Sequence, residues 1–276
     1  MPADLHVHTK LSDGLESPEE LVLLAKEGGL NIVAITDHDV IAAIARAQEK
    51  GRELGLEVIP GIEFTTEDYG AELHILGYFI DYHNPQLLDS IKKMQKGRED
   101  RIFKICEKLK GLGFELDPDK IFGQAEHRAP GRPHIARAMV EAGYVNNFRE
   151  AFRGCLEFGG PAYVPHYKLT AIEAIKLISE ASGLAVFAHP AVSGCDQVIP
   201  DLMSAGLAGL EVYYPSHNEG QTEHYLNLAK KYNLLATGGS DYHGLDSGRN
   251  LKLGDFTIPD ELVEKLKNEH LRRNKP

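Results

Sequence analysis

The chain has 276 residues, 42% hydrophobic and 26% charged, which is an ordinary globular composition and excludes disordered, collagen-like and coiled-coil chains. Its net charge of −11 argues against a protein that coats long duplex nucleic acid, because such binding depends on lysine and arginine. The three widely spaced cysteines form no CxxC pair, and no leader or apolar run of about 18 residues is found, so we expect a cytoplasmic protein without a membrane span, disulfide framework or thiolate zinc site.

Short apolar, β-branched runs alternate with helical patterns along the chain. The candidate strands are residues 5–9, 32–36, 57–64, 72–80, 184–188, 210–214 and 234–238. The helical patterns between them cover residues 18–27, 40–54, 171–181 and 219–232. Ser17, with Glu20 three residues later, has the spacing of a capping box at the start of the first helix. Such alternation predicts an α/β fold of parallel βαβ units.

The alternation breaks over residues 83–160. A long charged helical pattern at 86–112 is followed by shorter ones at 133–142 and 147–154, so we expect an all-helical insertion after the fourth strand. Residues 1–82 and 161–276 would then form the remaining domain. The insertion holds 14 lysines and arginines against 11 acidic residues, a local charge of +3 in an otherwise acidic chain.

Histidines and carboxylates gather at the predicted strands. His6 and His8 alternate along the first strand, so both imidazoles point to one face. The full set of candidate ligands is His6, His8, Asp13, His38, Glu63, His74, His189, Asp241 and His243. Glu63 ends the third predicted strand and His74 lies early in the fourth. If the strands are parallel in a closed or nearly closed barrel, their carboxyl ends share the face on which such barrels place active sites.

Six imidazoles and three carboxylates without a thiolate suit Zn, Mn or Fe, and they exceed the four to six ligands of one ion. Two or three divalent ions are therefore predicted. Asp37 and Asp39 flank His38, and we expect them to orient that histidine or to cap the following helix. His217 follows the sixth strand and either contacts substrate or lies on the surface. No role at the site is expected for four other histidines, His83, His127, His224 and His270.

These ligand motifs resemble the PHP (polymerase and histidinol phosphatase) family of metal-dependent phosphoesterases. The matching stretches are His6-Val7-His8 with Asp13, Thr36-Asp37-His38, Gly61-Ile62-Glu63, His74, Ala188-His189-Pro190 and Ser240-Asp241-Tyr242-His243-Gly244. The resemblance implies a distorted seven-stranded (β/α) barrel with a trinuclear site. It implies one ion on His6, His8, Glu63 and Asp241, a second on Glu63, His74 and His189, and a third on Asp13, His38 and His243.

The helical insertion is similar to that of the subgroup that hydrolyses 3′,5′-bisphosphorylated nucleosides and short 5′-phosphorylated oligonucleotides. In that subgroup, basic residues of the insertion hold the phosphate that is not cleaved. The candidates here are Arg98, Arg101, Arg132, His134 and Lys168. Arg98 and Arg101 lie one turn apart on a predicted helix, and Arg132 lies at a predicted helix N-terminus, where backbone amides favour anions. The alternative for each arginine is a solvated helix face.

The sequence thus predicts a metal-dependent phosphohydrolase that removes the 3′-phosphate of nucleoside 3′,5′-bisphosphates through metal-activated water. His243 and His217 are candidates for the general acid, Mn is the expected ion, and Zn and Fe are the alternatives. The expected partner is a small nucleotide or a short oligonucleotide. Three other functions remain open: a 5′–3′ exoribonuclease on short 5′-phosphorylated RNA, a histidinol-phosphate phosphatase, and a non-enzymatic metal-binding or polymerase-associated module.

Overall fold

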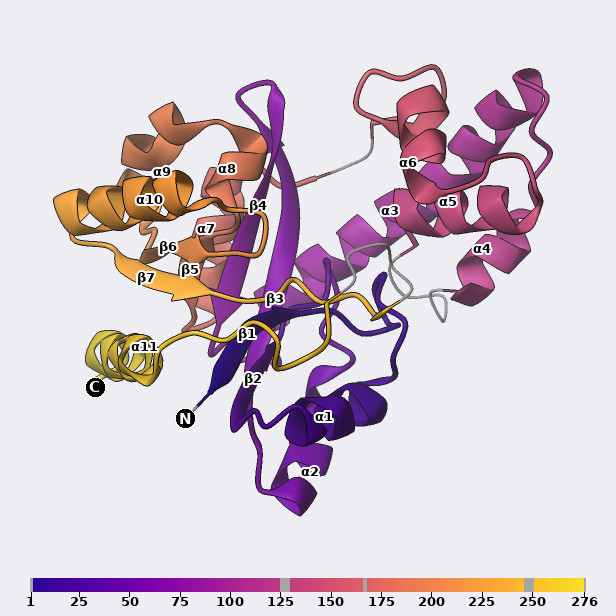
Figure 1. The fold of residues 1–276 in the computed structure, drawn as a ribbon. Coiled ribbons are helices and arrows are strands. Elements are labelled where there is room, and N and C mark those ends of the chain that lie inside the picture. Colours follow the sequence, from indigo (N-terminus) through magenta and orange to yellow (C-terminus); the bar gives the residue numbers. More distant parts are fainter. Residues whose placement is uncertain (1, 125–129, 166–167, 246–250, 276) are drawn as a thin grey trace.

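The computed structural model describes residues 2–124, 130–165, 168–245 and 251–275. Seven strands form one sheet in which the strand order follows the chain (Figure 1). They are β1 (Ala3–Val7), β2 (Ile32–Ile35), β3 (Glu57–Asp68), β4 (Ala71–Tyr78), β5 (Leu184–Phe187), β6 (Gly209–Tyr213) and β7 (Leu235–Gly238). All seven predicted strands are therefore present.

Helices connect the strands and cover the sheet. They are α1 (Pro18–Glu27), α2 (Ile44–Leu54), α3 (Pro85–Gly111), α4 (Pro118–Gln124), α5 (Arg132–Glu141), α6 (Phe148–Ala151), α7 (Ala171–Glu180), α8 (Pro190–Ser193), α9 (Ile199–Ala205), α10 (Glu219–Tyr232) and α11 (Asp260–Arg273), with a π-helical turn η1 (Phe152–Leu156) and a 3-10 turn η2 (Asp196–Val198). The predicted capping box begins α1: the Glu20 amide donates to the Ser17 hydroxyl, and the Ser17 amide donates to the Glu20 carboxylate. Among the described helices, none has the length and apolar character needed to cross a membrane.

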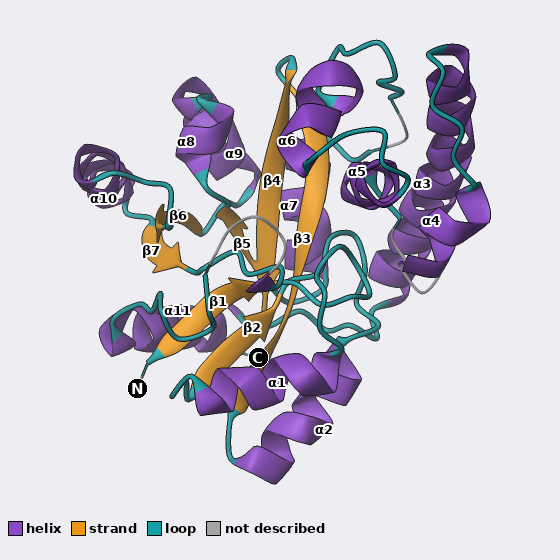
Figure 2. Cartoon of the chain, turned by 45° about the vertical axis from the view of Figure 1, so that its right-hand side comes forward, coloured by secondary structure: helices purple, strands orange, loops and turns teal. Residues whose placement is uncertain are grey.

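The expectation that all strands are parallel is wrong at β4. β1, β2 and β3 pair in parallel, as do β5, β6 and β7, but β4 is antiparallel to both β3 and β5. Tyr69 and Gly70 alone join β3 to β4, and both have positive φ (53° and 74°), as a tight hairpin turn requires. A parallel connection would need a crossover of a dozen or more residues. Figure 2 shows the resulting long hairpin.

β3 also continues to Asp68, so Glu63 lies inside the strand rather than at its end. His74 pairs with Thr65 in the hairpin, which places the early part of β4 beside the late part of β3. The antiparallel direction of β4 therefore explains why a histidine early in a strand reaches the same end of the sheet as residues that follow other strands.

The sheet curls so that its first and last strands approach each other. Val7 forms an isolated bridge with Tyr242, and the His8 amide donates to the Tyr242 carbonyl over 2.9 Å. Gly239 lies so close to β1 that a Cβ atom there would be 2.4 Å from the His6 amide nitrogen, so this position requires glycine. The fold is a curled seven-stranded half-barrel, which confirms the predicted distorted barrel.

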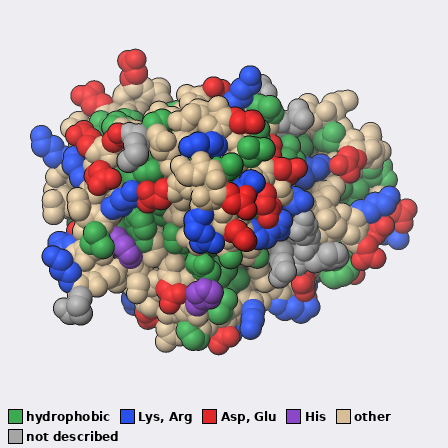
Figure 3. All heavy atoms as spheres, turned by 90° about the horizontal axis from the view of Figure 1, so that it is seen from below, with side chains coloured by type: hydrophobic (Ala, Val, Ile, Leu, Met, Phe, Trp, Pro, Cys, Tyr) green, Lys and Arg blue, Asp and Glu red, His purple; other side chains and the backbone are tan. Residues whose placement is uncertain are grey.

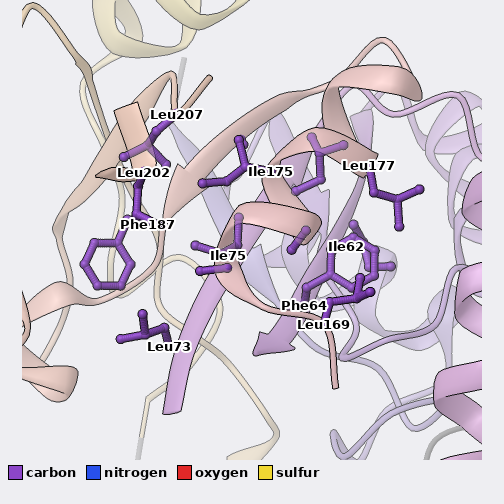
Figure 4. Close-up of a cluster of buried hydrophobic side chains, with 14 of the residues drawn as sticks. Ile62, Phe64, Leu73, Ile75, Leu169, Ile175, Leu177, Phe187, Leu202 and Leu207 are labelled. Carbon is purple, nitrogen blue, oxygen red and sulfur yellow. The ribbon is translucent and has the colours of Figure 1, made fainter. Parts of the chain in front are cut away.

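Separate apolar clusters stabilise the sheet and the helical segment after β4. One cluster packs the face of β3 to β6 against α7 and α9 and includes Phe64, Phe187 and Ile175 (Figure 4). Another joins α3, α4, α5 and η1 through residues such as Leu109 and Met139. Seen from below, acidic and basic side chains are interspersed over the surface (Figure 3). The helices from α3 to η1 thus have a core of their own beside the sheet (Figure 1).

Candidate metal centre

Imidazoles and carboxylates from both halves of the sheet meet at one end of it. Three groups each contribute ligand atoms that all lie within 4.8 Å of one another: His8, Asp13, His38 and His243; His6, His8, Glu63 and Asp241; and His38, Glu63 and His74. The ninth side chain, His189, reaches the same place, because its Nε2 atom lies 3.1 Å from Glu63 Oε1. The structure therefore brings all nine candidate ligands together.

Glu63 lies at the centre of this cluster and is buried. Its two carboxylate oxygens lie within 3.2 Å of nitrogen atoms from five imidazoles, those of His6, His8, His38, His74 and His189. Among the described residues, Glu63 Oε2 still finds no partner in hydrogen-bonding geometry, and neither does buried His8 Nδ1. The Nε2 atoms of His6 and His8 face each other across 3.0 Å. Buried lone pairs directed at one another fit divalent cations held between them.

The electrostatics of the cluster favour positive charge. Burial by itself disfavours a charged imidazole, but the nearby carboxylates of Asp241 and Glu63 outweigh it and raise the pKa of His8 to about 9. The pKa of His74 rises to about 10 for the same reason, here because of Glu63 and Glu72. Carboxylates that draw protons onto buried histidines would equally attract metal cations.

The sequence did not reveal Glu211 as part of this centre. Its side chain is fully buried on β6, where Oε1 lies 2.9 Å from His6 Nδ1 and Oε2 accepts a hydrogen bond of 2.8 Å from the His189 amide. When His6 donates its Nδ1 proton to Glu211, its Nε2 lone pair is directed into the cluster. The available signal was a single carboxylate inside an apolar strand, between Leu210 and Val212.

Asp37 holds the loop after β1, and Asp39 binds β3 and α3. Asp37 Oδ1 and Oδ2 accept hydrogen bonds from the Thr9 amide and hydroxyl, over 2.6 and 2.8 Å, and burial raises the pKa of Asp37 to about 6. Asp39 Oδ1 accepts from the Thr65 amide over 3.1 Å. The ring of His38 instead contacts the Thr65 hydroxyl at 3.2 Å, and α2 has no side-chain cap. The expectation that these aspartates cap the helix is therefore wrong, and of the two only Asp39 is connected to the His38 ring, through Thr65.

Three residues of the site have left-handed backbone conformations. The φ angles are 27° for His189, 53° for Asp39 and 51° for Asp241. Such angles cost about 1–3 kcal/mol for a residue other than glycine, and they persist only where the surrounding structure fixes them. The strained backbone at these positions therefore lowers the stability of the fold, and it fixes the directions of these side chains.

A cavity of about 180 Å³ opens beside the cluster. It is lined by candidate metal ligands, among them Asp13, His38 and His74, and by Arg98, Arg101 and Arg132, which we call the basic wall. Arg98 and Arg101 are 6% and 4% exposed, so the alternative of a solvated helix face is wrong for both. The cavity thus brings acidic and imidazole groups together with guanidinium groups.

The basic side chains near the cavity differ in whether an acidic side chain already neutralises them. Arg98 forms a buried ion pair with Asp39. Arg132 and Lys168 both bind the carboxylate of Glu72, Arg132 with Nη2 at 2.9 Å from Oε1. Arg101 donates from Nε to the Val164 carbonyl over 2.6 Å, while its Nη2 is buried and has no hydrogen-bond partner among the described residues.

Three further histidines were predicted to bind substrate or to act as the general acid, and each has its own hydrogen-bond partner. His134 is buried in the first turn of α5 and accepts at Nδ1 from the Gly131 amide, and it does not line the cavity. His217 is buried and donates from Nδ1 to the Val212 carbonyl over 2.9 Å. His243 Nδ1 lies 2.8 Å from the Asp241 carbonyl oxygen, and its Nε2 lies 3.2 Å from Asp13 Oδ1.

The histidines without an expected role lie elsewhere. His83 is exposed near the start of α3. His224 on α10 pairs with Asp196 over 2.7 Å, and His270 on α11 stacks on Phe79 with ring centroids 4.7 Å apart. His127 lies outside the described residues.

Several known proteins are similar to this chain over most of its length. A 5′-3′ exoribonuclease of Haemophilus influenzae is 34% identical, covering 93% of this chain and 96% of that protein. A phosphoribosyl 1,2-cyclic phosphate 1,2-diphosphodiesterase of Eggerthella lenta is 32% identical, covering 94% and 100%. A 3′,5′-nucleoside bisphosphate phosphatase of Chromobacterium violaceum is 30% identical, covering 89% and 88%.

A crystal structure assigned as a metal-dependent phosphoesterase from Bifidobacterium adolescentis superposes with a TM-score of 0.89 at 32% identity, covering 99% of this chain and 96% of that one. The model of the PHP domain matches residues 4–153, which is more than half of the chain. The resemblance seen in the ligand motifs is therefore confirmed. The chain belongs to the PHP domain family and is a phosphoesterase.

Proposed function

We propose that this phosphoesterase removes the 3′-phosphate of nucleoside 3′,5′-bisphosphates and cleaves short 5′-phosphorylated RNA in the same orientation. The observation that carries the proposal is the buried guanidinium of Arg101, whose Nη2 has no partner among the described residues and which lines the same cavity as several candidate metal ligands. A substrate with two phosphates would place one at the ligand cluster and the other at the arginines. The Haemophilus and Chromobacterium relatives bear the names of these two activities.

The nine clustered side chains fit two or three divalent ions, with Mn expected. Because a neutral imidazole binds one ion, His6, His8, Glu63 and Asp241 would hold one ion, Asp13, His38 and His243 another, and Glu63, His74 and His189 a third. When bound, such ions activate a water molecule and neutralise phosphoryl oxygens. The protein directs the ligands: Glu211 sets the tautomer of His6, and the Tyr214 hydroxyl donates to Asp241 over 2.8 Å.

The basic wall would hold the phosphate that is not cleaved. Arg98 and Arg132 are paired with Asp39 and Glu72, so they shape the wall without adding a full free charge. Arg101 keeps a donor available, and its guanidinium stacks 5.3 Å above the Tyr163 ring, which fixes its plane. We assign Arg101 to the 5′-phosphate, because a guanidinium fork matches phosphate geometry.

Of the two candidate general acids, His243 fits a ligand role. Its Nδ1 proton is directed to the Asp241 carbonyl, so its Nε2 presents a lone pair beside Asp13. His217 stands outside the three ligand groups, and its Nε2 is buried without a partner among the described residues. The Nδ1 proton of His217 goes to the Val212 carbonyl and burial lowers its pKa, so its Nε2 also presents a lone pair, and we assign proton donation to neither histidine.

The first experiment measures kcat/KM of the Mn-loaded protein for adenosine 3′,5′-bisphosphate, adenosine 3′-monophosphate, a 5′-phosphorylated RNA trimer, histidinol phosphate and a phosphoribosyl cyclic phosphate. The bisphosphate and the trimer should have the highest kcat/KM values. A lead for histidinol phosphate or the cyclic phosphate would overturn the proposal, and so would absence of turnover with metal bound, which is the behaviour of a binding module.

Arg101→Ala tests the assignment of the 5′-phosphate. Removing a charged hydrogen bond costs about 1.5–3 kcal/mol, so the preference for bisphosphate over 3′-monophosphate should fall about 10- to 150-fold. Arg149→Ala, at an exposed residue of α6 outside the cavity, serves as the matched control and should keep the wild-type preference. An unchanged preference in Arg101→Ala would contradict the assignment.

A further inference from the structure

A second cavity, of about 340 Å³, opens onto the same ligand cluster. It shares Glu72, His74 and Arg132 with the first cavity, and it is also lined by His189, Phe158 and Val192. His189 does not line the first cavity, whereas Asp13 and His243 do. The two cavities therefore reach the cluster past different ligands, with the Arg132–Glu72 ion pair between them.

Phe158 gives this second cavity an aromatic wall. The side chain is 52% exposed, and its ring centroid lies 5.0 Å from that of Tyr163 at an interplanar angle of 55°. Tyr163 in turn lies beneath the guanidinium groups of Arg101 and Arg132, at 5.3 and 5.7 Å. The exposed ring is thus attached to the same wall that carries Arg101, and Val192, 63% exposed, lines the cavity as well.

The chemistry of the proposed reaction requires a place for a second nucleotide when the substrate is RNA. Water adds to the phosphorus that follows the first nucleotide, the bond from phosphorus to O3′ of the first ribose breaks, and O3′ takes up a proton. The first nucleotide leaves as a 5′-monophosphate, and the next one keeps the attacked phosphate as its new 5′-phosphate. With the first 5′-phosphate on Arg101, the second nucleotide must extend from the cluster away from that cavity.

We propose that the second cavity binds the nucleotide on the 3′ side of the scissile phosphate, with Phe158 stacking on its base. This inference rests on the proposed function and extends it to the specificity for RNA. An aromatic ring stacks on any base, so the site accepts RNA without sequence preference. A bisphosphate has no second nucleotide and leaves this cavity unused, which makes Phe158 a residue that determines specificity for chain length.

The kinetic test compares a 5′-phosphorylated RNA dinucleotide with adenosine 3′,5′-bisphosphate in wild type, Phe158→Ala and Phe158→Trp. Loss of one stacked base costs about 1–3 kcal/mol, so Phe158→Ala should lower the ratio of kcat/KM for dinucleotide over bisphosphate by about 5- to 150-fold, and Phe158→Trp should restore it. Phe103→Ala, at a ring on α3 that is 50% exposed and lines neither cavity, should keep the wild-type ratio. A ratio within twofold of wild type in Phe158→Ala would overturn the inference.

A binding test separates this inference from the proposed function. The chain contains no tryptophan, so Phe158→Trp introduces a single fluorophore into the cavity. A non-hydrolysable phosphorothioate dinucleotide should quench its fluorescence, and the bisphosphate should not. Quenching by the dinucleotide in a protein that hydrolyses neither substrate would support the cavity assignment and defeat the proposed function, whereas equal quenching by both compounds, or none, would overturn the cavity assignment.

Discussion

Glu211→Gln tests how the fold orients its metal ligands. Glu211 has no exposed surface, and its two oxygens serve two separate donors, His6 Nδ1 at 2.9 Å and the His189 amide at 2.8 Å. Glutamine has the same shape but one oxygen and one amino group. Either His6 or the His189 amide therefore loses its acceptor, and the negative charge that holds the Nδ1 proton on His6 is removed.

The expected loss follows from these two contacts. Removing the partner of a metal-ligating histidine lowers metal affinity about 10- to 100-fold, which corresponds to about 1.4–2.7 kcal/mol. Leaving one buried donor unpaired costs about 1–3 kcal/mol of stability. We therefore expect a weaker Mn complex whose activity recovers in excess Mn, because the ligands themselves remain in place.

Calorimetric titration of the metal-free protein with Mn measures the change, with circular dichroism to verify folding. Asp196→Asn is the matched control, since Asp196 also binds a histidine, His224, over 2.7 Å, and a tyrosine hydroxyl, that of Tyr225, over 3.0 Å, outside the ligand groups. The control should bind Mn as wild type does. If Glu211→Gln also kept its Kd within twofold of wild type, Glu211 would be an ordinary core residue and the reasoning would fail.

Two further changes test the site as part of the fold. Gly239→Ala forces a Cβ atom to within 2.4 Å of the His6 amide nitrogen. This overpacking should lower the free energy of unfolding, measured in urea, by about 1–3 kcal/mol and should weaken Mn binding. Gly111→Ala, where the added atom meets open space, should change neither quantity. Chelation of the metal should lower Tm reversibly, because each ion at 100 times its Kd contributes about 2.7 kcal/mol; an unchanged Tm on chelation would mean that the cluster holds no ion.

The arrangement of the ligands was predictable because it depends on local pattern. His6 and His8 alternate on one strand, and His38, His189 and Asp241 follow strands that the apolar runs mark clearly. Any sheet that joins these strands in order brings their ends together.

The direction of β4 was not predictable in the same way. The polar stretch from Thr65 to Glu72 has the composition of a loop, whereas the structure continues both strands through it to a two-residue turn. Pairing between the two strands, with Thr66 Oγ1 also donating to the Leu73 carbonyl over 2.7 Å, overrides the weak strand propensity of this stretch.

The pairing of the arginines could not be predicted from sequence, since it depends on contacts between distant segments. Arg98 meets Asp39 across 59 residues, and Arg132 meets Glu72 across 60. Sequence patterns indicate that a helix carries charge, but only packing decides whether a charge is solvated or buried against a partner.

Glu72 connects the ligand cluster to the basic wall. One of its oxygens lies 3.5 Å from His74 Nε2 in the ligand cluster, and the same carboxylate binds Arg132 of the basic wall and Lys168. Because one carboxylate balances both sides, a change in charge at the cluster alters the field at the wall. The net charge of −11 therefore says little about the proposed phosphate binding, which would depend on a few cations held in place by Asp39 and Glu72.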